Sequence, residues 1–413
     1  MKKCWMERDF TLLWIGQFIS QIGDKFYAIA LAWWVLERTK SPWMMGMLMT
    51  ASVLPGLIVG PLAGGCIDRW NRKRILVLTD IIRGVSVFGV AVLAGLGQLR
   101  IEYIFGVAVI ISVAAAFFNP TVAAVIPQLV PKEQLARANS LSQLIDGVTK
   151  VMGPLAGALV VGWLGFTPVF MINGLSFLIA AGLTVLMKRA LAPTGPTGRT
   201  ITADVQSGLR FIVNNNQVRV VLIIIGLAHL NVGGLAVIVP MLAKGLSGSG
   251  ITNLGLLEMM VGAGMIAGSL LFGLQKRRTV GGHWLFGAMT VMGSSFLIIG
   301  AGLGNKVTAV GPFMVLMTLI GGSIAVASIY WTAILQSNVP NEMAGRVFSI
   351  AVTLGNTTLP VAYGLYGGLL SFAPIAVVLG TSGVGLILIT LLLGVLYRRS
   401  SLQGHFVDSS TGS

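Results

Sequence analysis

Apolar residues fall in long runs, separated by short polar segments, along the whole chain. We distinguish twelve such runs, at residues 10–36, 42–66, 75–97, 102–127, 140–162, 167–188, 219–242, 250–274, 282–303, 310–335, 346–370 and 375–397. An α-helix rises about 1.5 Å per residue, so each run is long enough to cross a hydrocarbon core of about 30 Å. The pattern predicts an all-α membrane protein with twelve transmembrane helices.

The composition agrees with this prediction and excludes several other classes of protein. Of the 413 residues, 55% are apolar and only 10% are charged, whereas soluble domains carry about 25% charged residues. A soluble enzyme and a disordered chain are therefore excluded. Cys4 and Cys66 are the two cysteines, too few for a disulfide scaffold. The first run is also too long, and with Asp24 and Lys25 too polar, for a cleaved signal peptide.

The 28 Lys and Arg residues, which give a net charge of +15, are distributed unevenly between the two sides of the membrane. With the N-terminus placed in the cytoplasm, the outer side receives only Arg38, Lys40, Arg100, Lys244 and Lys306, and the spans contain only Lys25, Arg83 and Lys150. All other cations lie on the cytoplasmic side, as the positive-inside rule requires. We therefore expect both termini in the cytoplasm, and no nucleic-acid partner for the basic excess.

The two parts of the chain resemble each other. Val, Pro, Glu and Arg of the segment 130–137, before the fifth run, recur 209 residues later in the segment 339–346, before the eleventh run. This internal repeat predicts two pseudo-symmetric six-helix halves. The first half comprises residues 1–190. The second, with a short cytoplasmic tail, comprises residues 219–413.

A linker at residues 191–218 joins the two halves and begins with a turn-rich Pro-Thr-Gly segment. Beyond that segment, Ile201, Val205, Leu209 and Ile212 recur at about the helical period. The linker is therefore predicted to contain an amphipathic cytoplasmic helix. This helix either lies against the membrane surface or packs on neighbouring protein segments.

A motif of acidic, basic and glycine residues stands between the second and third runs, in the segment 64–74. It resembles the signature Gly-x-x-x-Asp-Arg-x-Gly-Arg-Arg/Lys of the major facilitator superfamily. The matching residues are Gly64, Asp68, Arg69, Arg72 and Lys73, and Asn71 replaces the second glycine. The resemblance implies the twelve-helix major facilitator fold and a gating latch that favours the outward-open state. Gly64 would allow close helix approach. The second-half copy at 273–278 has no acid, so the latch would be asymmetric.

Two further segments, 16–24 and 131–140, resemble one bacterial branch of this superfamily. That branch contains macrolide and multidrug exporters, siderophore exporters and lysophospholipid flippases. The likeness implies a multi-pass protein of the bacterial cytoplasmic (inner) membrane. In the fifth run, Gly153-Pro154-x-x-Gly157 is similar to the end of the antiporter motif. Gly-Pro bends a span and frees a carbonyl group, which suits either a cavity wall or an ordinary structural bend.

Charges inside spans need an explanation, because each costs about 2.5–3.5 kcal/mol on insertion scales. Asp24 lies near the middle of the first run, and its sequence neighbour Lys25 points about 100° away around the helix. We expect Asp24 to couple proton movement to transport. The other candidates for proton coupling or substrate binding are Arg83, Asp146, Lys150, His229 and Glu258.

A structural role remains open for each of these other candidates. Arg83 can form an interface pair with Asp80, three residues before it. Asp146 and Lys150 are spaced i, i+4 and can form a buried pair. His229 can be a hydrogen-bonded histidine of the helix bundle, and Glu258 can face solvent instead of a cavity.

These features predict a secondary transporter, not an enzyme. The chain has no nucleotide-binding motif and no paired metal-ligand spacing, so we expect no cofactor and no metal. The hypothesis is proton-coupled efflux of an amphipathic, drug-like molecule of macrolide or multidrug type, by alternating access between two halves. A lysophospholipid flippase or a siderophore exporter is the alternative. The fourth run lacks the Arg common in proton antiporters, and a flippase needs no proton. The expected partners are the substrate, protons and the lipid bilayer, for a monomeric chain.

Overall fold

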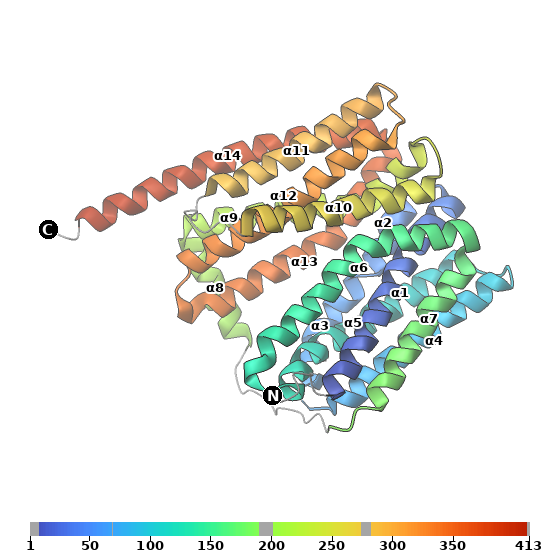
Figure 1. The fold of residues 1–413 in the computed structure, drawn as a ribbon. Coiled ribbons are helices and arrows are strands. Elements are labelled where there is room, and N and C mark those ends of the chain that lie inside the picture. The colour runs from blue at the N-terminus through green and yellow to red at the C-terminus, as the bar shows by residue number, and fades with distance from the viewer. Residues whose placement is uncertain (1–7, 68, 190–200, 274–281, 411–413) are drawn as a thin grey trace. The chain divides into compact units, whose positions relative to one another are not determined.

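The computed structural model describes residues 8–67, 69–189, 201–273 and 282–410, and these residues are almost entirely α-helical (Figure 1). The first helices are α1 (Arg8–Thr39), α2 (Pro42–Ala51), α3 (Leu54–Ile67), α4 (Arg72–Gly95), α5 (Ile101–Leu129), the 3-10 turn η1 (Lys132–Gln134), α6 (Leu135–Leu164) and α7 (Phe166–Val185). The later helices are α8 (Ile201–Asn214), α9 (Asn216–Gly245), α10 (Gly250–Gly273), α11 (Gly282–Gly304), α12 (Val310–Asn338), α13 (Asn341–Phe372) and α14 (Ile375–Ser410). The predicted all-α class is confirmed.

Eleven of the predicted runs correspond to one helix each, and the run 42–66 is divided between α2 and α3. The break falls at Ser52 and Val53, directly before Leu54 and Pro55. Pro55 has no N–H to donate, and its ring disfavours a helical conformation of the residue before it. The local break therefore follows from the position of this proline.

Ten helical segments in the described part of the chain are long and apolar enough to cross a membrane. The two long helices outside this set are α1 and α13, with 32 residues each. Both are rich in polar side chains: α1 carries Gln17, Gln21 and Asp24, and α13 carries Asn356 and Thr357. A multi-span helical protein is thus established, whereas the count of twelve spans and the cytoplasmic position of both ends stay predictions.

The chain divides into two compact units, which we call unit 1 (residues 1–197 and 248–259) and unit 2 (residues 198–247 and 260–413). In unit 1, α4 packs along α7, and α1 packs against α6 and α7. In unit 2, α11 packs along α14, and α9 packs against α13 and α14. The helices at equivalent places in the sequence repeat therefore make equivalent pairs. The domain boundaries at 190 and 219 stay predictions.

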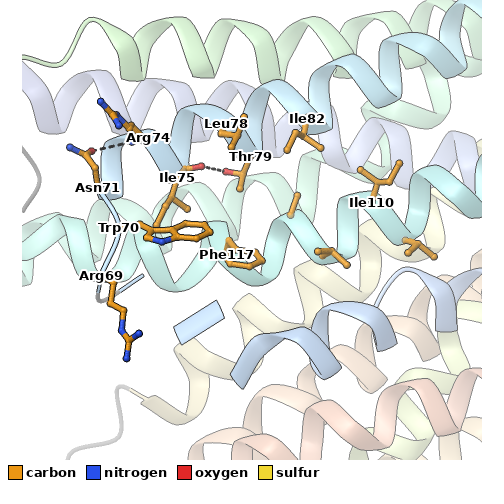
Figure 2. Close-up of a pocket in the computed structure, with 13 residues that line it drawn as sticks. Arg69, Trp70, Asn71, Arg74, Ile75, Leu78, Thr79, Ile82, Ile110 and Phe117 are labelled. Carbon is orange, nitrogen blue, oxygen red and sulfur yellow. Dashed lines mark hydrogen bonds between the residues drawn. The ribbon is translucent and has the colours of Figure 1, made fainter. Parts of the chain in front are cut away.

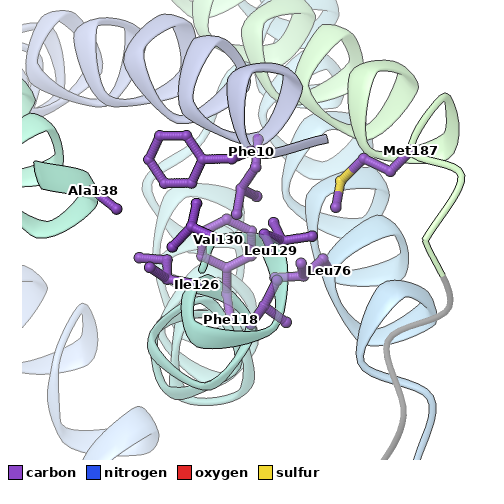
Figure 3. Packing of buried hydrophobic residues seen from close by; sticks show 10 residues of the cluster. Phe10, Leu76, Phe118, Ile126, Leu129, Val130, Ala138 and Met187 are labelled. Carbon is purple, nitrogen blue, oxygen red and sulfur yellow. The ribbon is translucent and has the colours of Figure 1, made fainter. Parts of the chain in front are cut away.

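One end of unit 1 is held together by a cluster of buried apolar side chains (Figure 3). Phe10 of α1, Leu76 of α4, Phe118 and Leu129 of α5, and Met187 after α7 meet in this cluster. Each of the five side chains is at most 8% exposed. The cluster therefore joins the ends of α1, α4 and α5 and the segment that follows α7.

The predicted linker helix is present as α8 in unit 2. Ile212 is buried, and a Cβ at Gly208 would lie 2.8 Å from Cδ1 of Ile350 on α13. The helix thus packs on protein, which favours the second of the two arrangements expected for it. Leu209 and Val213 remain exposed. Ile201 and Val205 belong to the same helix, but their side chains lie outside the described ones.

Candidate functional site

Three helices of unit 1 bring together a polar cluster, which we call the unit 1 polar cluster. It consists of Asp24 on α1, Asp80 and Arg83 on α4, and Asn173 on α7. Nδ2 of Asn173 donates a hydrogen bond of 3.4 Å to Oδ1 of Asp24. Arg83 is close enough to act on Asp24 electrostatically. Two of the residues expected to take part in coupling, Asp24 and Arg83, therefore share one site.

Arg83 is the centre of this cluster. Its Nη2 donates to Oδ1 of Asp80 at 2.6 Å, and both side chains are buried, with 5% and 1% exposure of the two residues. The guanidinium carbon lies 4.0 Å from the ring centroid of Phe118 on α5 and 4.6 Å from that of Phe177 on α7. Cation–π contacts of this kind stabilise a desolvated cation. The expected Asp80–Arg83 pair is thus formed, and it is buried among the helices of unit 1.

Asp24 differs from Asp80 in its environment. The residue is only partly buried. Among the described residues it forms no salt bridge, and the neutral amide of Asn173 is its hydrogen-bond partner. A Cβ at Gly23 would lie 2.5 Å from Oγ of Ser176 and 2.6 Å from Oδ1 of Asn173. The absence of a side chain at Gly23 therefore admits the polar side chains of α7 to α1.

Sequence analysis missed three residues around Asp24. Asn173 contacts the carboxylate directly, and its Oδ1 accepts a hydrogen bond of 3.2 Å from Oγ of Ser176. Tyr27 lies one helical turn after Asp24, and its buried hydroxyl has no hydrogen-bond partner in the part of the chain that the structure describes. The position of an amide inside the apolar run 167–188 is the sequence signal that could have identified Asn173.

The pair Asp146–Lys150 does not join this cluster. Nζ of Lys150 lies 3.4 Å from Oδ2 of Asp146, but the two side chains are 46% and 49% exposed. The pair is thus formed as the i, i+4 spacing suggests, but it is about half exposed and not buried in unit 1. Exposed ion pairs of this type contribute about 0–1 kcal/mol to the free energy of unfolding.

Gly153 and Gly157 place α6 in direct contact with α1 just after Asp24. A Cβ at Gly153 would lie 2.6 Å from Cβ of Lys25, and a Cβ at Gly157 would lie 2.9 Å from Cα of Phe26. The helix continues through Pro154, which cannot donate to the carbonyl of Lys150. The helix-bend motif of the sequence is thus a close-packing motif in unit 1.

We expect Gly157→Val to destabilise the protein by about 1–3 kcal/mol, because the new Cβ meets the backbone of Phe26 and α1 or α6 must shift. Thermal unfolding of the purified protein in detergent measures this effect. Gly147→Val on the same helix is the matched control, since no atom of the described residues lies within 4 Å of its Cβ position. Equal unfolding temperatures for the two variants would contradict the packing assigned to Gly157.

His229 lies on α9 in unit 2. Its Nδ1 is 2.8 Å from the carbonyl oxygen of Ile225, and a carbonyl only accepts, so Nδ1 carries the hydrogen. Nε2 faces Gly355, where a Cβ would approach to 2.8 Å. The ring also lines a cavity of about 160 Å³ with Met289 and Trp331. This environment is that of a hydrogen-bonded histidine inside a bundle, in line with the structural alternative.

Glu258 lies in the part of α10 that belongs to unit 1. It is partly buried and interacts electrostatically with Lys25 of α1. Lys25 acts in the same way on Asp24. Sequence analysis gave Lys25 no role, because its helical position points away from Asp24. Lys25 thus acts electrostatically on both carboxylates, although Arg83 acts more strongly on Asp24.

The basic residues of the signature loop have different structural roles. Arg72 is buried, and its Nη1 donates to the carbonyl of Ala124 on α5 at 3.1 Å. Nζ of Lys73 donates to the carbonyl of Val185, the last residue of α7, at 2.9 Å and to that of Met187 at 2.6 Å. Oδ1 of Asn71 accepts from the backbone N–H of Arg74 and caps α4. These contacts tie the loop to two neighbouring helices of unit 1.

Other parts of the predicted latch are not placed by the structure. Asp68 and residues 274–278 of the second-half copy lie outside the described residues. The close helix approach expected at Gly64 is not seen, because no described atom lies within 4 Å of a Cβ position there. The gating role of Gly64, Asp68, Arg69, Arg72 and Lys73 therefore stays a prediction.

Known proteins similar to this chain are transporters. Macrolide efflux protein A of Streptococcus pyogenes is 25% identical over 361 residues, which cover 85% of this chain and 87% of the relative. The enterobactin exporter EntS of Citrobacter koseri is 24% identical over 388 residues, which cover 94% of this chain and 91% of the relative. Both relatives are matched along almost their whole length.

The fold also has a solved counterpart. A bacterial homologue of the iron transporter ferroportin, in an inward-facing state, matches 95% of this chain and 98% of its own length, with a TM-score of 0.72 and 16% sequence identity. At this identity the likeness concerns the fold alone. Residues 5–406 match the family described as transmembrane secretion effector. The chain therefore belongs to this family of the major facilitator superfamily and is a multi-pass transporter of the bacterial cytoplasmic membrane, not an enzyme.

Proposed function

We propose that the chain exports an amphipathic, drug-like small molecule by alternating access, and that proton entry drives the export. The observation behind this proposal is the unit 1 polar cluster, where the guanidinium of Arg83 pairs with Asp80 and acts electrostatically on the nearby Asp24 inside a helix bundle. Such intramembrane charges mark substrate and proton pathways in transporters. The likeness to macrolide and enterobactin exporters supports export as the direction.

Asp24 is the carboxylate that exchanges a proton for cargo in this proposal. Arg83 is bound to Asp80 at 2.6 Å, whereas Asp24 is held by a neutral amide and is only partly buried. With both acids ionised, the cluster carries one excess negative charge, and one proton neutralises it. The ionised form attracts a cationic cargo from the cytoplasm, and protonation from outside releases that cargo. Asp146, Lys150, His229 and Glu258 remain candidates for secondary roles.

The proposed topology has twelve spans in two six-helix halves, residues 1–190 and 219–413, with both ends in the cytoplasm. In this topology α1 and α13 are the two polar spans. The distribution of Lys and Arg and the repeated helix pairs of units 1 and 2 support it. The protein would act as a monomer, because each chain contains both halves.

Inside-out vesicles test this function directly. The vesicles are acidified by respiration, and a panel of macrolides and cationic dyes is then added while the internal pH is recorded. We expect cargo-dependent proton leak from vesicles that contain the protein and none from vesicles without it. Cargo movement that persists after the proton gradient is collapsed would overturn the proton coupling and leave the export assignment standing.

A siderophore exporter is the second candidate. It is favoured by the match to the enterobactin exporter, which covers more of this chain than the macrolide efflux match does, at 94% against 85%. Secretion of siderophore by an exporter-deficient bacterial strain, with and without this chain, separates the two candidates. A lysophospholipid flippase would instead move labelled lipid between leaflets without a proton gradient.

We expect Asp68→Asn to slow turnover and to leave cargo binding largely unchanged, since Asp68 belongs to the proposed latch and not to the polar cluster. Transport rates in vesicles and cargo affinity of the purified protein are the two measurements. Glu133→Gln, an exposed acid in η1 on the same side of unit 1, is the control. Equal losses of rate and affinity would show that Asp68 takes part in cargo binding.

A further inference from the structure

An apolar groove runs along α4 and α5 of unit 1 and has a volume of about 730 Å³ (Figure 2). Its floor includes the buried side chains of Ile75 and Ala114. Leu78 and Ile82 of α4 and Ile110 of α5 stand along it with 57%, 39% and 42% exposure. Its size falls in the range of ligand pockets, about 300–1,000 Å³. The groove is thus large enough for apolar chains, and unit 1 alone forms it.

One end of the groove is basic and carries an aromatic ring. Arg69, Trp70, Asn71 and Arg74 line this end, at the N-terminus of α4 (Figure 2). Arg72 and Lys73, in the first turn of α4, are engaged by main-chain carbonyls. The side chains of Arg69 and Arg74 are exposed, and neither has a hydrogen-bond or ion-pair partner among the residues that the structure describes. Two cations are therefore available where the apolar groove ends.

We infer that this groove binds one anionic glycerophospholipid of the bilayer. The phosphodiester binds at the basic end that Arg69 and Arg74 line, and the acyl chains follow Leu78, Ile82 and Ile110. Guanidinium groups bind phosphate through paired hydrogen bonds, and the N-terminus of a long helix adds favourable N–H dipoles. The indole of Trp70 suits the polar–apolar boundary at which a glycerol backbone sits. The distribution of Lys and Arg places this end in the cytoplasmic leaflet, where anionic lipids attract basic loops.

This lipid site is separate from the proposed transport site. It uses Arg69 and Arg74 of the signature loop, whereas the unit 1 polar cluster uses Asp24, Asp80 and Arg83. The two sites lie on the same helix α4, but Leu78 and Ile82 are exposed and Asp80 and Arg83 are buried. A bound lipid would therefore contact a different face of α4 and need not be cargo. Lipid binding can be measured without any transport assay, so it stands or fails independently of the proposed function.

Native mass spectrometry of the full chain, released from detergent micelles, tests the inference. The protein is mixed with phosphatidylglycerol or with phosphatidylcholine of identical acyl chains. We expect wild-type protein to retain one phosphatidylglycerol at concentrations at which phosphatidylcholine is lost. Each cation near a membrane surface strengthens the attraction of anionic lipid severalfold, so Arg69→Gln/Arg74→Gln should retain this lipid at least about tenfold less.

Two further variants distinguish lipid binding in the groove from a general attraction of anionic lipid to the basic side of unit 1. Lys132→Gln/Lys188→Gln removes the same charge from exposed positions on the same side of unit 1, and lipid retention should stay within about twofold of wild type. Val113→Trp fills the groove and keeps both arginines, so retention of phosphatidylglycerol should fall.

Three results would overturn the inference. The first is equal retention of phosphatidylglycerol and phosphatidylcholine by the wild-type protein. The second is an equal loss in the control variant Lys132→Gln/Lys188→Gln. The third is a dimer, held through this face, in place of a protein–lipid complex.

Discussion

Asp24→Asn should fold and insert normally yet lose gradient-driven export, by about a hundredfold or more in initial rate. The substitution removes a charge from a span, which makes insertion less costly. It also removes the group that binds a proton in the proposed exchange, and general acid–base groups of this kind contribute about 10²–10⁴-fold. Proton-gradient-driven uptake of cargo into inside-out vesicles gives the rate, and the amount of purified protein shows whether the chain folds.

The same substitution should affect cationic cargo more than neutral cargo, because only the ionised carboxylate attracts a cation. Asp24→Glu restores a carboxylate one methylene further from α1, and we expect it to keep part of the activity. Glu102→Gln is the matched acid-to-amide control, since Glu102 is exposed at the start of α5. If Asp24→Asn exports against a gradient at the wild-type rate, the coupling group is elsewhere, and Glu258 or His229 becomes the candidate.

Arg83→Gln should have the largest effect on stability, a loss of about 3–5 kcal/mol, because it leaves Asp80 as a buried charge without its partner. Arg83 is 5% exposed, forms the 2.6 Å pair with Asp80 and lies over two phenyl rings. Without the guanidinium, the carboxylate of Asp80 would stay buried away from solvent, because Asp80 is 1% exposed. The unfolding temperature of the purified protein and its yield from membranes measure the loss.

The double variant Asp80→Asn/Arg83→Gln should recover much of this loss, because it removes both partners of the buried pair. Lys150→Gln is the matched control, since its ion pair with Asp146 is about half exposed and should contribute about 0–1 kcal/mol. A double variant as unstable as Arg83→Gln alone would show that Arg83 acts chiefly through Phe118 and Phe177. Its pairing with Asp80 would then contribute little to stability.

The sequence by itself determined the helical class and the position of nearly every helix. A hydrocarbon core admits few backbone structures, so a run of about 20 apolar residues already specifies a membrane helix. The exception is the break between α2 and α3, where Pro55 interrupts an apolar run without changing its hydropathy. The signature at 64–74 likewise indicated the superfamily, and Asp24 was found because a charge in a span is costly.

Only the tertiary structure decided which of the charged residues lie together. Asp24, Arg83 and Asn173 belong to three spans that are far apart in sequence, and their contact depends on glycines such as Gly23 that admit the neighbouring side chains. Asp146 and Lys150 have favourable i, i+4 spacing and form their pair, yet the structure leaves both side chains about half exposed. A span that is apolar on every face has no periodic pattern to show which face will be buried. That choice is made by the fit between helices, which no single segment of sequence contains.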